Sequence, residues 1–187
     1  MNRPRNTVRI IAGEYRSRVL SFPDIPGLRP TPDAVRETVF NWLGQNLKGA
    51  RCLDLFAGSG ALGFEAASRH AARVVLVEKS PRAFCALRAN QNKLGGAQVA
   101  LVAMDALYYL KQCAERFDVI FLDPPYDDKT MLLQQALPML TACLNFNTVD
   151  APVVYLEARA WPVLEGWSVL RQGKSGAVHY GLITSAQ

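Results

Sequence analysis

An acidic residue, two prolines and an aromatic residue end a strongly apolar run: Asp123-Pro124-Pro125-Tyr126 directly follows VIFL at 119–122. Such a pattern predicts a buried strand that stops abruptly. The Asp123 carboxylate and the Pro124 carbonyl could accept hydrogen bonds from the exocyclic amine of a nucleobase, a weak nucleophile, while the prolines hold both acceptors in place. Tyr126 could stack on an extruded base. The alternative is a rigid turn with an aspartate cap and a core tyrosine.

A glycine loop, DLFAGSGALG at 54–63, follows an earlier apolar run and opens a predicted helix. Its glycines, Gly58, Gly60 and Gly63, would let the backbone approach a ligand closely. Glu78, at the end of the next apolar run, could bind ribose hydroxyls, as it would also in a nicotinamide or flavin protein. Asp54, however, would repel a pyrophosphate and attract the cationic S-adenosylmethionine. The loop therefore favours S-adenosylmethionine, with an ordinary strand-to-helix turn and a capping aspartate as the alternative.

A further acidic residue, Asp105 in AMDAL, follows the third apolar run. It could accept a hydrogen bond from the adenine amino group of the cofactor, or it could cap the helix that follows. The residues expected to hold the cofactor are Asp54, Phe56, Gly58, Gly60, Glu78, Lys79, Asp105, Ala106 and Asp123.

The elements that must position these residues alternate between strands and helices. Apolar runs at 52–56, 73–78, 98–103 and 118–123 predict strands, and helix-forming segments lie between them at 61–69, 81–94 and 106–116. This alternation predicts an α/β fold with a parallel sheet covered on both faces. A helix at 129–144, a fifth strand at 153–158 and a hairpin of 167–172 with 177–184 complete the pattern. We therefore expect a mostly parallel sheet with an antiparallel last strand.

The first part of the chain differs from this pattern and carries most of the positive charge. Residues 8–11 and 18–22 predict a short hairpin, and a helix is expected over 33–47, with Thr31 as its cap and Pro32 at its first position. Residues 1–36 hold seven arginines and three acidic residues, a local charge of +4, whereas the whole chain has a net charge of +5. Arginines suit contact with phosphates, although a solvated hairpin would explain them equally well. We expect an extension at 1–48 and a catalytic domain at 49–187.

Length and composition exclude several classes of protein. With 187 residues and 50% hydrophobic residues, the chain suits one domain, and it shows neither a signal peptide nor a run long enough to span a membrane. A cytoplasmic location is the expectation. The widely spaced Cys52, Cys85, Cys113 and Cys143 indicate buried, reduced thiols, with no metal site and no disulfide.

Several blocks together resemble the bacterial enzymes that form N2-methylguanosine in 16S ribosomal RNA. They are RIIAGEYRSRVL at 9–20, LRPTPDAVRETVFNWL at 28–43, CLDLFAGSGALGFEAASR at 52–69 and FLDPPY at 121–126. The resemblance implies a Rossmann-like class I methyltransferase with a seven-stranded sheet, which uses S-adenosylmethionine in a direct in-line transfer. It implies catalytic roles for Asp123, Pro124, Pro125 and Tyr126, and RNA contacts for Arg9, Arg16, Arg18, Arg29, Thr31 and Arg36. Pro30 belongs to the same segment. The chain departs from many guanine-N2 enzymes in having an aspartate rather than an asparagine at 123.

Other functions share some of these motifs. A DNA or RNA adenine-N6 methyltransferase would have both the glycine loop and the DPPY motif, and a nicotinamide-dependent oxidoreductase would have only the loop. A non-catalytic RNA-binding or assembly protein on the same fold is a third alternative. The expected partner is 16S ribosomal RNA, within an assembled or partly assembled 30S subunit because the charge outside residues 1–36 is modest, and we expect a monomer.

Overall fold

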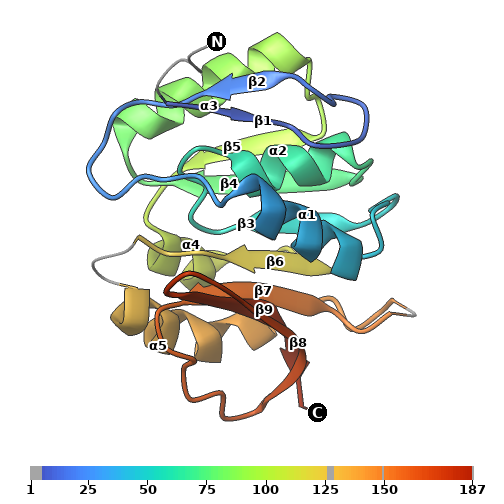
Figure 1. The fold of residues 1–187 in the computed structure, drawn as a ribbon. Coiled ribbons are helices and arrows are strands. Elements are labelled where there is room, and N and C mark those ends of the chain that lie inside the picture. The colour runs from blue at the N-terminus through green and yellow to red at the C-terminus, as the bar shows by residue number, and fades with distance from the viewer. Residues whose placement is uncertain (1–5, 126–128, 149, 187) are drawn as a thin grey trace.

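A twisted seven-stranded sheet forms the centre of the molecule (Figure 1). The computed structural model describes residues 6–125, 129–148 and 150–186, so Tyr126 lies outside the described part. The strand order is β5-β4-β3-β6-β7-β9-β8; β3 to β7 pair in parallel, and β9 is antiparallel to both β7 and β8. These strands are β3 (Arg51–Asp54), β4 (Arg73–Glu78), β5 (Val99–Ala103), β6 (Val119–Leu122), β7 (Val153–Ala158), β8 (Trp167–Ser175) and β9 (Val178–Ser185). The predicted Rossmann-like methyltransferase fold is confirmed.

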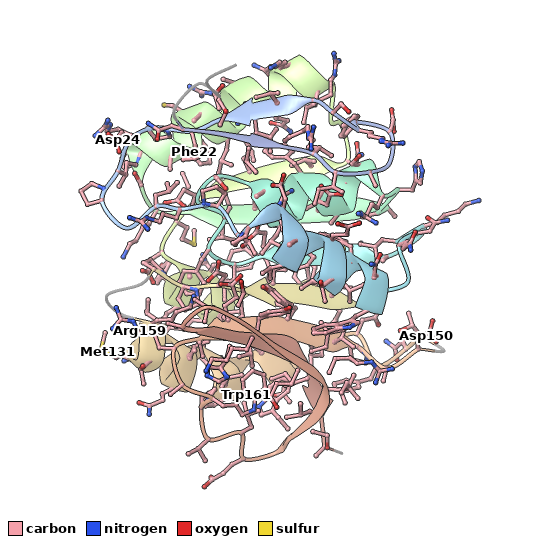
Figure 2. The ribbon with its side chains drawn as sticks, in the orientation of Figure 1. Phe22, Asp24, Met131, Asp150, Arg159 and Trp161 are labelled. Carbon is pink, nitrogen blue, oxygen red and sulfur yellow. The ribbon has the colours of Figure 1, made fainter. Side chains whose placement is uncertain are left out.

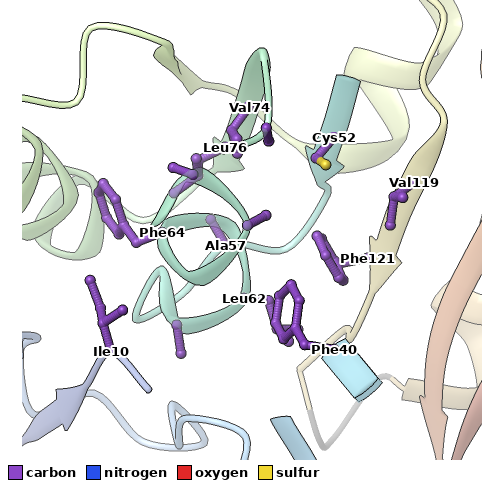
Figure 3. Close-up of a cluster of buried hydrophobic side chains, with 14 of the residues drawn as sticks. Ile10, Phe40, Cys52, Ala57, Leu62, Phe64, Val74, Leu76, Val119 and Phe121 are labelled. Atoms are coloured by element: carbon purple, nitrogen blue, oxygen red, sulfur yellow. The ribbon is translucent and has the colours of Figure 1, made fainter. Parts of the chain in front are cut away.

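Helices cover both faces of the sheet, since each inner strand is apolar on both sides. The face that carries Cys52 and Phe121 packs against α1 (Asp33–Trp42), α2 (Ala61–Ser68) and α3 (Pro81–Leu94). Figure 3 shows this cluster, with Phe40 of α1 beside Phe121 and Phe64 of α2 near Leu76. The other face packs against α4 (Ala106–Gln112), α5 (Lys129–Leu140) and the short 3₁₀ helix η1 (Thr141–Cys143).

Three helices are clearly shorter than the sequence predicts. α5 ends at Leu140 instead of 144, and the 3₁₀ helix η1 follows it. α4 ends at Gln112 instead of 116, because the backbone is already extended at Cys113 (φ −69°, ψ 114°). α1 ends at Trp42 instead of 47, because the chain turns through the left-handed Gly44 (φ +91°). The predicted cap of α1 is also wrong, since the capping position is Pro32 and the Thr31 hydroxyl contacts Asp123 instead.

The N-terminal hairpin shares the main core. Its strands, β1 (Thr7–Arg9) and β2 (Val19–Ser21), pair antiparallel and lie over α2 and α3 (Figure 1). Val8, Ile10 and Leu20 are buried in the same cluster as Phe40 and the sheet. The hairpin and α1 therefore depend on the sheet for the burial of their apolar side chains.

All four cysteines are free thiols. Cys52 and Cys143 are buried and Cys113 is half-buried, but Cys85 is exposed, which corrects the expectation that all four are buried. Burial, the largest cause, raises the pKa of the Cys143 thiol to about 12. Across the described ranges, no helix combines the length and the apolar character that a membrane crossing requires.

Candidate active site at the carboxyl ends of the strands

The candidate site lies where the strand order reverses. β3 is flanked by β4 on one side and by β6 on the other, and the chain passes from β4 to β5 before it returns to β6. Ligands of open α/β sheets bind beyond the carboxyl ends of the strands at such a point. Asp54 and Glu78 end β3 and β4, and Asp123 directly follows β6, so all three lie at this edge. In Figure 1 the edge is on the left, the side to which β6 points.

Two carboxylates shape the glycine loop through hydrogen bonds to its backbone. Glu78 accepts from the Gly58 N–H at 2.8 Å through Oε2 and from the Ser80 N–H at 2.6 Å through Oε1. Asp54 Oδ2 accepts from the Gly63 N–H at 3.0 Å. The acids predicted to face the cofactor therefore also fix the loop on which it would lie.

Gly60 is required by both conformation and space. Its φ is +76°, a left-handed value that other residues rarely adopt. A Cβ atom there would lie 2.6 Å from the Phe64 ring and 2.7 Å from Leu87 Cδ2. The close approach of the loop to α2 and α3 therefore needs glycine at this position.

Asp54 is buried among other acids. Burial raises its pKa to about 7; the Gly63 N–H opposes this rise, and the negative charges of Asp123 and Glu78 add to it. A positively charged ligand at this edge would relieve that repulsion, whereas a pyrophosphate would increase it. The electrostatics thus match the charge preference that the sequence indicates.

Asp123 is held by two neighbours that come from different parts of the chain. Its Oδ1 accepts from the Lys129 ammonium at 2.6 Å, and its Oδ2 accepts from the Thr31 hydroxyl at 3.4 Å. Pro124 is buried and Pro125 is exposed. The carboxylate is therefore oriented from both sides at the point where β6 ends.

Lys129 connects Asp123 to a second buried acid that sequence reasoning missed. Its Nζ lies 3.6 Å from Glu157 Oε2, and Glu157 Oε1 accepts from the Tyr155 hydroxyl at 2.6 Å. Burial first, and then the charge of Asp123, raises the pKa of Glu157 to about 7, while Lys129, Tyr155 and Thr31 oppose the rise. The sequence offers one signal, a glutamate inside the apolar run VVYLEA. For Lys129 it indicates no more than the start of a helix.

The segment from Leu28 to Thr31 joins the two halves of the site. A Cβ atom on Gly58 would lie 3.8 Å from Leu28 Cγ, so this segment passes over the glycine loop before Thr31 reaches Asp123. Arg29 is exposed on the same segment. Closure of this segment over cofactor and RNA stays a prediction.

Arg36 is completely buried, contrary to the exposure that a direct RNA contact requires. Its guanidinium donates to Glu65 at 3.2 Å, to Asp33 at 2.7 Å, and to the carbonyls of Thr31 and Arg9. In this arrangement Arg36 positions the segment that carries Thr31, and its donors already have partners within the protein.

Two of the hairpin arginines, Arg16 and Arg18, lie at the amino ends of the strands, away from the candidate site. Tyr15, in the turn, donates its N–H to Ser68 Oγ at the end of α2, and its hydroxyl accepts from Gln98, just before β5. Both partners mark the amino ends of the strands, where Figure 1 shows this turn on the right. Arg16 and Arg18 are exposed there, and Arg9 is exposed on β1. The structure therefore separates Arg16 and Arg18 from Thr31 and Asp123, whereas the Arg9 carbonyl lies near that of Thr31, because the Arg36 guanidinium donates to both.

The remaining predicted cofactor residues occupy the same edge as Asp54. Asp105 Oδ1 accepts from the Leu107 and Tyr108 N–H groups at 2.9 and 3.1 Å, so it caps α4, one of the two roles that the sequence allowed. Lys79 is exposed after β4, Phe56 is half-buried after β3, and Ala106 is buried in the first turn of α4. The edge can thus offer carboxylates, loop backbone and an aromatic side chain to one ligand.

The comparisons with known proteins agree with this geometry. The family model described as conserved hypothetical protein 95 matches residues 8–184. Ribosomal RNA small subunit methyltransferase D of Escherichia coli K12 is 39% identical over 179 residues, covering 94% of this chain and 88% of that protein. The protein of the same name from Haemophilus influenzae is 39% identical over 185 residues, with 95% and 94% covered.

A solved structure gives the same result in three dimensions. That of yhhF from Escherichia coli superposes with a TM-score of 0.85 at 34% identity, covering 97% of this chain and 99% of that one. The chain therefore belongs to the family described as conserved hypothetical protein 95, and it is similar over most of its length to proteins named ribosomal RNA small subunit methyltransferase D.

Proposed function

We propose that this protein transfers a methyl group from S-adenosylmethionine to the exocyclic N2 of a guanine in 16S ribosomal RNA. The observation that carries the proposal is the meeting of two sites at the carboxyl ends of adjacent strands. The acidic glycine loop follows β3, and the Asp123-Pro124-Pro125 turn follows β6. The relatives' names support small-subunit ribosomal RNA as the substrate.

The residues at the end of β3 and β4 fit the cofactor. Asp54 and Glu78 give this edge a negative character suited to a sulfonium and an ammonium, and Gly58 and Gly60 let the backbone approach closely. Phe56, Lys79, Asp105 and Ala106 would complete the pocket. S-adenosylmethionine would supply the methyl group from its positively charged sulfur and leave as S-adenosylhomocysteine.

The turn after β6 would act on the target amine. Asp123 and the Pro124 carbonyl accept hydrogen bonds from the NH2 group, which directs the nitrogen lone pair toward the methyl carbon. Once the new nitrogen–carbon bond has formed, the Asp123 carboxylate takes the proton that the nitrogen loses. Tyr126 and Pro125 would hold the base, and Arg29 with Thr31 would close over it. No cysteine lies in either motif, in keeping with direct transfer and no covalent enzyme intermediate.

The proposal also covers how the RNA is presented and where the protein acts. Residues 1–48 would present RNA to the catalytic unit at 49–187, with Arg9, Arg16 and Arg18 contacting phosphates and the latter two lying away from the reacting base. We propose a cytoplasmic monomer that acts on assembled or partly assembled 30S subunits. Equal turnover on protein-free 16S RNA would contradict the preference for the subunit.

The test is transfer of labelled methyl from S-adenosylmethionine to small subunits, and in parallel to DNA, from cells that lack the protein, followed by nucleoside analysis. We expect N2-methylguanosine in 16S RNA. N6-methyladenine in either substrate would show that the target base is adenine and not guanine. Asp123→Ala should abolish transfer, with a smaller effect on cofactor binding, because Asp123 is only one of several residues expected to hold the cofactor. Asp150→Ala, at an exposed position on the opposite edge (Figure 2), is the control and should change neither.

A further inference from the structure

Lys129 is a buried cation shared by two carboxylates. Its side chain is 9% exposed, and its ammonium lies 2.6 Å from Asp123 Oδ1 and 3.6 Å from Glu157 Oε2. A buried ammonium needs such partners, because a charge left without them in the interior is strongly destabilising. Lys129 therefore has a fixed place, and the oxygen of Asp123 that it contacts is committed to it.

The second oxygen of Asp123 is then the one available to a substrate. Oδ2 has the Thr31 hydroxyl at 3.4 Å, a longer and weaker contact than the one to Lys129. An ionised aspartate offers two acceptor oxygens, whereas an asparagine offers one oxygen and one NH2 group. With asparagine at 123, Lys129 would take the single oxygen, because the NH2 group cannot accept from an ammonium. The NH2 group would then face the target amine, donor against donor.

We propose that Asp123 and Lys129 form a functional pair, in which Lys129 takes one acceptor oxygen and thereby makes the second acceptor oxygen of an aspartate necessary at position 123. Lys129 is a positioning residue that acts through Asp123. The inference rests on the proposed function, since it concerns the amine that Asp123 would receive.

The experiment is a double-mutant cycle with Asp123→Asn and Lys129→Met, read as methyl transfer to small subunits. Asp123→Asn alone should lower kcat by about tenfold or more, since an amine donor would meet a second donor. In the double variant the amide can turn its NH2 group toward Glu157 and its oxygen toward the substrate. The double variant should therefore exceed Asp123→Asn by about tenfold, a rescue that a merely structural lysine would not produce.

The control pair is Asp123→Asn with Lys111→Met, which removes an exposed lysine of α4 and should rescue nothing. Thermal unfolding and the Kd for S-adenosylmethionine establish that each variant is folded. A folded double variant no more active than Asp123→Asn would overturn the pairing, as would full activity of Asp123→Asn. Calorimetry with guanosine 5′-monophosphate in the presence of S-adenosylhomocysteine should give the same ranking without turnover. If the wild-type protein and the variants bind guanosine 5′-monophosphate in this ranking but the wild-type protein methylates no subunit, the proposed function is refuted and the pairing stands.

Discussion

Glu65 joins the N-terminal extension to the catalytic unit, and its replacement by glutamine should be severe. The side chain is completely buried and accepts four hydrogen bonds: from the Ile11 and Ala12 N–H groups at 2.8 and 3.0 Å, and from Arg36 and Arg69 at 3.2 and 2.9 Å. Glutamine has nearly the same size, but it removes the charge that balances two buried guanidinium groups and replaces one acceptor oxygen by a donor.

The expected loss of unfolding free energy follows from the buried ion pairs that Glu65 makes with Arg36 and Arg69. Removing one side of a buried ion pair costs about 3–5 kcal/mol, against a typical total of about 5–15 kcal/mol for a domain. With a urea dependence of about 2 kcal/mol per molar, the unfolding midpoint should fall by about 2 M. Glu115→Gln is the matched control. That carboxylate is partly exposed between Arg51 and Arg73, so its loss should cost about 1 kcal/mol or less.

The assay is urea unfolding of both variants followed by circular dichroism, together with methyl transfer well below the midpoint. Arg36 also donates to the Thr31 carbonyl at 3.2 Å, so the loosened arginine should displace Thr31 from Asp123 and lower kcat in Glu65→Gln. Equal midpoints for the Glu65 and Glu115 variants would refute the reasoning that this buried cluster holds the extension on the site.

Two further predictions concern the cofactor edge. Gly60→Ala should cost about 2–4 kcal/mol, from a left-handed φ and a clash with Phe64, and weaken S-adenosylmethionine binding. Gly49→Ala, with a similar φ but open space around it, should cost only about 1 kcal/mol in the same unfolding assay and spare binding; similar losses would contradict the steric argument. Because a bound cation favours the ionised form of Asp54, whose pKa is raised to about 7, affinity for S-adenosylmethionine should increase from about pH 5.5 to 7.5. Calorimetry should show a weaker pH dependence in Asp54→Asn, and an unchanged one would exclude Asp54 as its source.

Much of the fold was predictable because its signals are local. Apolar runs and the breakers that end them are encoded within about ten residues, so the bounds of β4, α3 and β7 agree with the expected ranges 73–78, 81–94 and 153–158. The same local pattern predicts that Asp54, Glu78 and Asp123 end parallel strands. Parallel strands share one carboxyl edge, so the meeting of the two motifs was also within reach of the sequence.

The contacts between charged side chains were decided only by the tertiary structure. Thr31 lies 92 positions from Asp123 in the chain, and nothing local distinguishes a helix cap from a partner of that carboxylate. The sequence does not distinguish Arg36 from the exposed arginines, yet Arg36 faces Glu65 inside the core. Lys129 meets Glu157 because β6 and β7 are adjacent in the sheet. Residue type and spacing specify which chemistry is available, whereas the packing of distant elements decides which charge is buried and which partner it binds.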